Sequence, residues 1–114
     1  MNPKDRQHDT GIATITPIGR VDALSAPELR KSMDDSIDDG VRNLIIDLTD
    51  VEFLDSAGMA ALVVGMKRTR QQGGDTKLVW PANPQICRIF LLTKFDKVFD
   101  FADTVSGAEE LFGD

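Results

Sequence analysis

The sequence contains only one cysteine, Cys87, and only one histidine, His8, among its 114 residues. A single cysteine forms no internal disulfide, and one cysteine with one histidine cannot supply the ligand set of a zinc site. His8 lies near the N-terminus and would have to reach across the fold to activate a serine, which argues against a Ser–His–acid triad. Cys87 has apolar neighbours in a predicted helix, which indicates a packed, inert thiol. We therefore expect neither a bound metal nor an enzyme activity.

Long apolar runs, an excess of basic residues and phosphate-binding glycine motifs are also missing. The apolar stretches fall far short of the ~20 residues that span a bilayer, and the polar N-terminus lacks the apolar core of a signal peptide. A net charge of −6 argues against binding to nucleic acid or to anionic membrane surfaces. No glycine pattern matches a nucleotide-binding fingerprint, so no cofactor is expected. These features predict a cytoplasmic protein whose partner carries a basic patch.

What the sequence does contain is a regular alternation of strand-like and helix-like segments. The expected strands cover residues 12–18, 43–48, 77–80 and 97–101. The expected helices cover residues 25–39 and 57–72, a segment that begins at Asn83, and residues 104–112. Strands that alternate with helices imply a mainly parallel sheet. The prediction is a single α/β domain over residues 11–114, with a central sheet of roughly four or five strands and about four helices. Residues 1–10 are expected to form an N-terminal arm or a short edge strand.

The segment before the first expected helix contains a turn and a capping signal. Residues 19–22 follow the first strand and are expected to form a turn. Ser25 and Glu28 have the spacing of a capping box, in which each side chain accepts a hydrogen bond from the backbone amide of the other residue. The sequence therefore predicts that Ser25 caps this helix.

The most distinctive motif is Asp55-Ser56-Ala57-Gly58, between an apolar strand and an apolar helix. It sets a small hydroxyl at the N-terminus of a helix, beside a carboxylate. Ala57 and Gly58 have almost no side chain, so a kinase or a partner protein can approach Ser56 closely. The motif lacks the first glycine of a nucleophile elbow. Two interpretations stay open from these residues: Ser56 is a regulatory site, or it is a helix N-cap that contributes ~1 kcal/mol.

Several carboxylates lie near the ends of expected strands. Asp22 and Asp55 each close a connection from a strand to a helix, where local turn bonding is one explanation. Asp47 interrupts an apolar strand, so it either points to solvent or bonds a turn amide. Functional groups of an open parallel sheet gather at the carboxyl ends of its strands. We therefore expect Asp22, Asp50 and Asp55 to share one face.

Three stretches carry a resemblance to a known family: residues 19–29 (GRVDALSAPEL), 45–58 (IIDLTDVEFLDSAG) and 72–74 (QGG). Together they resemble a STAS domain, and more narrowly the bacterial anti-sigma factor antagonists. The similarity runs from Gly11 to Phe112, and its most specific element is the Asp-Ser-x-Gly turn. The departures are small: Met59 stands where these proteins often have leucine, and Lys94-Phe95 replaces a glycine–leucine pair.

The resemblance implies a partner-switching protein that acts in transcription regulation during a stress response. In this family the unphosphorylated antagonist binds an anti-sigma factor that is also a serine kinase, which frees the sigma factor. The kinase phosphorylates the serine of the Asp-Ser-x-Gly turn, here Ser56, and the complex dissociates. A serine phosphatase then restores the active form. Thr49, near the end of the strand, is the second candidate for phosphorylation.

The chemistry of Ser56 fits this implied role. A phosphate adds about −1.5 to −2 charge beside Asp55. The free amides and the dipole of a helix N-terminus tolerate such an anion, whereas a desolvated interface complementary to a bare hydroxyl does not. The residues expected at the centre of the partner contact are Asp22, Asp55, Ser56, Ala57, Gly58 and Met59.

A second interpretation keeps the fold and changes the role. Some small STAS proteins are subunits of lipid or solute transport assemblies, where the same face holds an ATPase. In that interpretation Ser56 is an unmodified contact. A neighbouring kinase-type anti-sigma gene favours the switch, and a neighbouring transporter gene favours the transport subunit.

Overall fold

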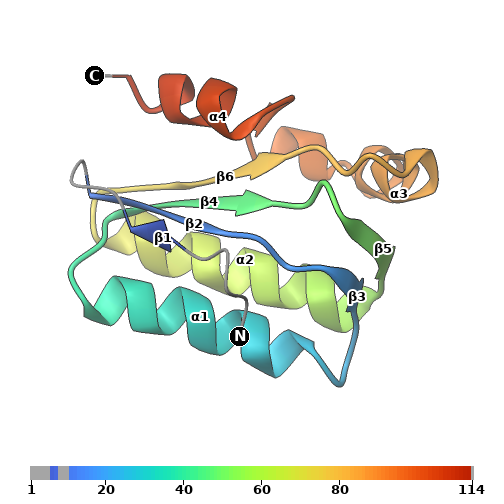
Figure 1. Ribbon diagram of the computed structural model, residues 1–114, viewed down its shortest axis with the longest axis horizontal. Helices are drawn as coiled ribbons and strands as arrows, with labels where there is room; N and C mark the ends of the chain where they lie inside the picture. The colour runs from blue at the N-terminus through green and yellow to red at the C-terminus, as the bar shows by residue number, and fades with distance from the viewer. Residues whose placement is uncertain (1–5, 8–10, 114) are drawn as a thin grey trace.

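The computed structural model describes residues 6–7 and 11–113, which form a layered α/β domain (Figure 1). The strands are β1 (Arg6–Gln7), β2 (Ile12–Ile15), β3 (Gly19–Val21), β4 (Asn43–Asp47), β5 (Val51–Leu54), β6 (Thr76–Val79) and β7 (Phe101–Ala102). The helices are α1 (Ala26–Asp38), α2 (Ser56–Gln71), α3 (Pro84–Leu92) and α4 (Val105–Leu111), with a 3-10 turn η1 (Phe95–Lys97).

The central sheet has five strands in the order β1-β2-β4-β6-β7. The short strand β1 pairs antiparallel with β2, and the other neighbours in the sheet pair in parallel. A second, two-stranded parallel sheet is formed by β3 and β5. The predicted α/β fold, with a mainly parallel sheet and four helices, is therefore confirmed.

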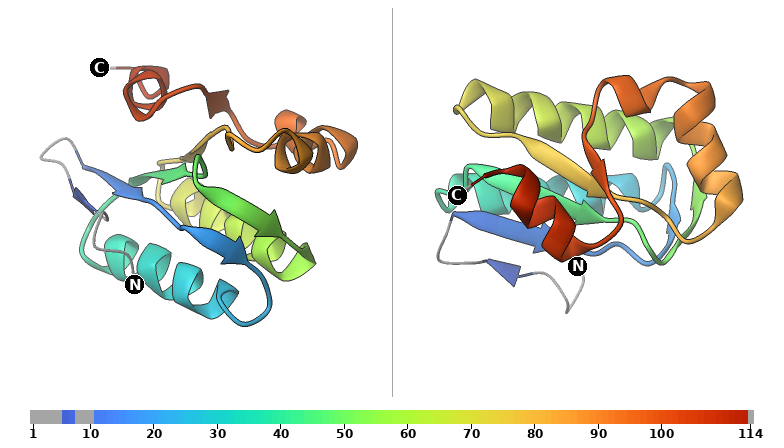
Figure 2. Two further views of the ribbon diagram at one scale, coloured as in Figure 1. Left: turned by 45° about the vertical axis from the view of Figure 1, so that its right-hand side comes forward. Right: turned by 90° about the horizontal axis from the view of Figure 1, so that it is seen from above.

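Helices cover both faces of the central sheet. Figures 1 and 2 show α1 and α2 together on one face and α4 on the other. Along β4, Leu44 and Ile46 belong to the larger core that includes buried residues of α1 and α2. Ile45, between them in sequence, packs instead with Val79 and with Ala108 of α4. Burial on both faces explains why β4 reads as a continuous apolar run.

The first disagreement with the sequence-based expectations concerns residues 19–22 and the segment before the Asp-Ser-x-Gly turn. The structure forms strand β3 where a turn was expected, and strand β5 where no strand was expected. The exposure of β5 does not alternate, because Val51 and Leu54 are buried while Glu52 and Phe53 between them are exposed. Without a period of two, its sequence carries no clear strand signal. The expected strand at residues 12–18 is also shorter, since β2 ends before the proline at position 17.

The capping box at Ser25 is absent. Ser25 occupies the N-cap position of α1, but its side chain makes no capping hydrogen bond. Its hydroxyl donates instead to the Arg20 carbonyl at 2.7 Å and accepts from the Asp22 amide at 3.0 Å. The prediction was wrong because the loop before the helix competes for the same hydroxyl.

The C-terminal part of the chain also differs from expectation. Residues 97–101 were predicted to form a strand, but Phe95–Lys97 form the 3-10 turn and the strand β7 has only two residues. The apolar alternation arises because Phe99 is buried in the core and Phe101 stacks on Trp80, with 3.9 Å between the ring centroids. The aromatic cluster therefore imitates the pattern of a strand.

Two further expectations concern Cys87 and the N-terminal arm. Cys87 is half-buried, its thiol donates to the Pro81 carbonyl at 3.1 Å, and burial raises the pKa of the thiol. This agrees with a packed, unreactive group. The expected N-terminal arm is described only at β1, and residues 1–5 and 8–10 lie outside the described residues. Across the described chain, no helix is both long and apolar enough to cross a bilayer.

Candidate functional site

The candidate site lies where the two-stranded sheet ends and α2 begins. In the parallel pair of β3 and β5, Val21 lies opposite Leu54, so the next residues of both strands meet. The Asp55 amide donates to the Val21 carbonyl at 3.3 Å, and the Ala23 amide donates to Asp55 Oδ2 at 3.2 Å. The structure thereby joins two loops that are distant in sequence.

Asp55, rather than Ser56, caps helix α2. Its Oδ1 atom accepts hydrogen bonds from the Ala57 amide at 2.9 Å and the Gly58 amide at 3.0 Å. Asp55 has the extended backbone of an N-cap residue, and Ser56 is the first residue of the helix. The alternative in which Ser56 is only a helix N-cap is therefore wrong. The expectation of free amides at this terminus is also wrong for Ala57 and Gly58, because the Asp55 carboxylate already occupies them.

This capping arrangement leaves the Ser56 hydroxyl available. Ser56 is exposed, and within the described part of the chain its side chain makes no hydrogen bond or ion pair. Thr49 differs, since its hydroxyl donates to Asp47 Oδ1 at 2.5 Å. The same carboxylate oxygen accepts from the Thr49 amide at 3.1 Å, which explains the acidic residue at the end of β4. Of these two hydroxyls, Ser56 is the one without an internal partner.

Asp22 organises the loop between β3 and α1. Its carboxylate accepts from the Arg20 guanidinium at 3.1 Å and from the backbone amides of Leu24 and Ser25 at 3.1 and 3.2 Å. These hydrogen bonds, that from Arg20 first, lower the pKa of Asp22 and favour its ionised form. Asp22 thus holds the loop before α1, while Asp55 caps α2 and accepts the Ala23 amide of that loop.

Asp50 does not join this group. Its carbonyl accepts from the Gly19 amide at 3.0 Å, which places Asp50 beside the start of β3. The strand β5 separates it from Asp55. The expectation of one shared face holds for Asp22 and Asp55, which are linked through Ala23, and is wrong for Asp50.

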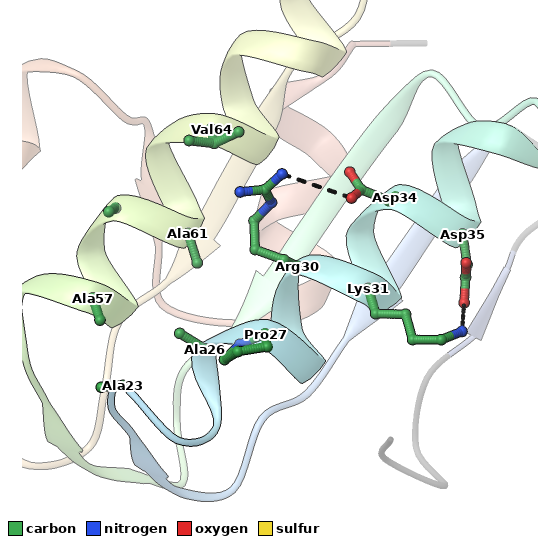
Figure 3. Close-up of a pocket in the computed structure, with 11 residues that line it drawn as sticks. Ala23, Ala26, Pro27, Arg30, Lys31, Asp34, Asp35, Ala57, Ala61 and Val64 are labelled. Atoms are coloured by element: carbon green, nitrogen blue, oxygen red, sulfur yellow. Dashed lines mark hydrogen bonds and ion pairs between the residues drawn. The ribbon is translucent and has the colours of Figure 1, made fainter.

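The small residues of the motif face different surroundings. Gly58 is buried, and a Cβ atom there would lie 2.4 Å from the Val21 carbonyl oxygen. Its missing side chain therefore serves close packing inside the domain, rather than the expected approach of a partner. Ala57 lines an open groove between α1 and α2, with a volume of about 690 Å³ (Figure 3). Met59 is half-buried and packs against the core.

The groove shown in Figure 3 borders the site. Alanines, among them Ala26 and Ala61, form much of its lining. Arg30 reaches from α1 along this groove and pairs with Asp34 at 3.8 Å. The side of α2 that carries Ala57 is consequently open, while the side that carries Gly58 is closed.

Comparisons with known proteins agree with this geometry. The STAS domain model matches residues 3–108. The chain belongs to the STAS domain family. An anti-sigma-B factor antagonist of Bacillus subtilis is 32% identical over 107 residues, which cover 94% of this chain and 95% of that protein. A crystal structure of an anti-sigma factor antagonist from Mycobacterium paratuberculosis has a TM-score of 0.83 at 29% identity, with 96% of this chain and 92% of that chain covered.

A second solved structure extends the similarity of fold for this STAS domain. SpoIIAA, an anti-sigma factor antagonist solved in its unphosphorylated form, has a TM-score of 0.79 at 19% identity, with 94% of this chain and 92% of that chain covered. The relatives of this STAS domain thus place it among the anti-sigma factor antagonists. Their names describe a regulatory role rather than a catalytic one.

Sequence reasoning missed some residues on the surface of this site. Leu24 is 91% exposed, and the Arg20 guanidinium lies 4.0 Å from the ring centroid of the exposed Phe53. The sequence did contain a signal for Leu24, because this leucine lies before α1 and outside the apolar period of that helix. Arg20 and Phe53 are paired only by the register of β3 and β5, which no local pattern reveals.

The capping role of Asp55 predicts a stability change. The variant Asp55→Ala removes the cap of α2 and the acceptor for the Ala23 amide, so we expect the free energy of unfolding to fall by about 1–2 kcal/mol. The variant Asp55→Asn retains one carbonyl oxygen for the cap and is expected to lose less. Urea denaturation measures both.

The matched control for this measurement is Asp50→Ala, which removes an exposed carboxylate from the other end of β5. It is expected to change stability by no more than about 0.5 kcal/mol. Equal losses for Asp55→Ala and Asp50→Ala would contradict the capping role.

Proposed function

We propose that this STAS domain is a partner-switching antagonist whose switch is Ser56. The unphosphorylated protein binds an anti-sigma factor with serine kinase activity in the cytoplasm and releases the sigma factor. Phosphorylation of Ser56 ends that binding, and a serine phosphatase reverses it. The contact centre comprises Asp22, Asp55, Ser56, Ala57, Gly58 and Met59, with Gly58 contributing through the backbone that it holds in place.

The observation that carries the proposal is the exposed Ser56 hydroxyl without an internal hydrogen-bond partner, at the first position of a helix that Asp55 already caps. A kinase can reach such a hydroxyl without unfolding the helix. A phosphate there would add about −1.5 to −2 charge next to Asp55. Because Asp55 already holds the amides of Ala57 and Gly58, these two donors would not be free to compensate the added charge.

The direct test incubates the protein with ATP and each candidate anti-sigma kinase of the same genome, then maps the phosphate by mass spectrometry. We expect phosphate at Ser56 in the parent protein and none in Ser56→Ala. Thr49→Ala is the matched control, since it removes the other candidate hydroxyl, and it should be phosphorylated at Ser56 as the parent is.

Phosphate at Thr49 would move the switch to that residue. A folded protein that no candidate kinase modifies would contradict the proposal and favour the transport-subunit role, in which Ser56 is an unmodified contact.

A further inference from the structure

The loop from Asp22 to Ser25 presents an apolar side chain to solvent. Leu24 is 91% exposed, the highest value among the large apolar side chains of the described residues, and Leu92 follows at 71%. A single exposed leucine is ordinary on a protein surface. The significance of Leu24 therefore depends on how its loop is held and on what lies beside it.

Every backbone amide of this loop donates a hydrogen bond. The Asp22 amide donates to Ser25 Oγ, the Ala23 amide to Asp55 Oδ2, and the amides of Leu24 and Ser25 to Asp22 Oδ1. An exposed loop does not need all of its amides bonded within the protein, because water can accept hydrogen bonds from them. A fixed backbone lowers the entropy lost on association, which is the property of a preorganised binding residue.

The same carboxylate connects Leu24 with Ser56. Asp55 holds the loop through its Oδ2 atom and caps the helix of Ser56 through its Oδ1 atom. In Figure 3, Ala23, the neighbour of Leu24 in the chain, lies near Ala57, the neighbour of Ser56. The apolar side chain and the candidate phosphorylation site consequently lie on two segments that the Asp55 carboxylate joins.

We infer that Leu24 is the apolar anchor by which the anti-sigma kinase recognises this protein, and that it enters an apolar pocket with a basic rim on the kinase. The inference rests on the proposed function. The basic rim follows from Asp55, which accepts the amide of Ala23 beside Leu24 and has no ion pair among the described residues, whereas Asp22 is already paired with Arg20. A second copy of this chain fits poorly, because its own site would bring the same carboxylates and its net charge is also −6.

The test compares phosphorylation kinetics of the parent, Leu24→Ala and Leu92→Ala with the kinase that modifies Ser56. Loss of a buried anchor should raise the KM for the Leu24→Ala protein by about tenfold or more, with little change in kcat. Leu92→Ala removes a similarly exposed leucine from the end of α3 and should behave as the parent does. Leu24→Met, which keeps an apolar side chain of similar size, should restore most of the affinity.

Each outcome separates the inference from the proposed function. Unchanged kinetics for Leu24→Ala, with normal phosphorylation of the parent, would overturn the inference alone. A parent protein that no anti-sigma kinase phosphorylates or binds would overturn the proposed function, and the inference with it. Analytical ultracentrifugation of the parent and Leu24→Ala adds a third outcome: a dimer that the substitution dissociates would assign Leu24 to self-association and overturn the inference. Urea denaturation should give equal stability for both proteins, since Leu24 is exposed.

Discussion

Phosphorylation of Ser56 is expected to weaken binding to the anti-sigma kinase by about a thousandfold, which corresponds to a loss of ~4 kcal/mol. The phosphate would introduce about −1.5 to −2 charge into a contact that already contains Asp22 and Asp55. It would find the amides of Ala57 and Gly58 taken by the Asp55 carboxylate. Like charges in a desolvated contact cost several kcal/mol, because neither water nor a donor compensates them.

Substitutions at Ser56 should reproduce parts of this effect. Ser56→Glu adds a single negative charge and is expected to weaken binding by about ten- to a hundredfold. Ser56→Ala removes only an exposed hydroxyl without an internal partner, so its affinity should stay within about threefold of the parent. Such a protein would remain constitutively active.

Isothermal titration calorimetry with the purified kinase measures these affinities. Thr49→Glu is the matched control, because it adds the same charge at the end of β4 and outside the proposed contact centre. The loss for Ser56→Glu should persist at raised salt concentration, since charges in a desolvated contact are screened much less than exposed ones. Equal affinities for Ser56→Glu and the parent would remove Ser56 from the switch.

The second large effect is expected at Gly58, where alanine should lower the free energy of unfolding by about 2–3 kcal/mol. A Cβ atom at this position would lie 2.4 Å from the Val21 carbonyl oxygen and 2.8 Å from Leu54 Cδ1. The Val21 carbonyl accepts the Asp55 amide, so relief of the clash requires a shift of the strand end that positions Asp55 and Ser56. The substitution should therefore impair partner binding as well as stability.

Gly65→Ala is the matched control in the same helix. Its Cβ atom would overlap Cε and Sδ of Met33, the far end of a flexible side chain, so the adjustment falls on a buried side chain rather than on backbone. Alanine also improves helix propensity by roughly 0.5–1 kcal/mol at both positions. Urea denaturation should place Gly58→Ala well below Gly65→Ala in stability. Equal free energies of unfolding, or a higher value for Gly58→Ala, would contradict the prediction and show that the end of β3 can shift at little cost.

Much of the architecture could be predicted from local patterns. The apolar run of β4 indicated a strand covered on both faces, and the structure buries its Ile45 on one face and its Ile46 on the other. Besides β3 and β5, which were not expected as strands, two regions were predicted incorrectly because a nearby group imposed the deviation. The Ser25 hydroxyl bonds to Arg20 and Asp22 instead of capping α1, and the packing of Phe99 and Phe101 resembles a strand pattern.

The candidate site was only partly predictable. The Asp-Ser-x-Gly motif located the serine and a neighbouring carboxylate, because these are consecutive residues. Asp55, rather than Ser56, caps α2 because of the backbone conformation at the start of the helix, which the motif alone does not reveal. The buried role of Gly58 depends on the position of Val21, a residue far away in sequence.

Local sequence was sufficient for most of the alternation of strands and helices, for the parallel central sheet and for the presence of a serine at a helix start. These features arise from periodicity and turn chemistry, which act over a few neighbouring residues. The pairing of β3 with β5 decided the remainder. It brings Ala23 to Asp55, joins the loop of Leu24 to the helix start at Ser56 and packs the Val21 carbonyl against Gly58. Hydrogen bonds and packing between distant segments depend on the register of the folded chain, which no short stretch of sequence contains.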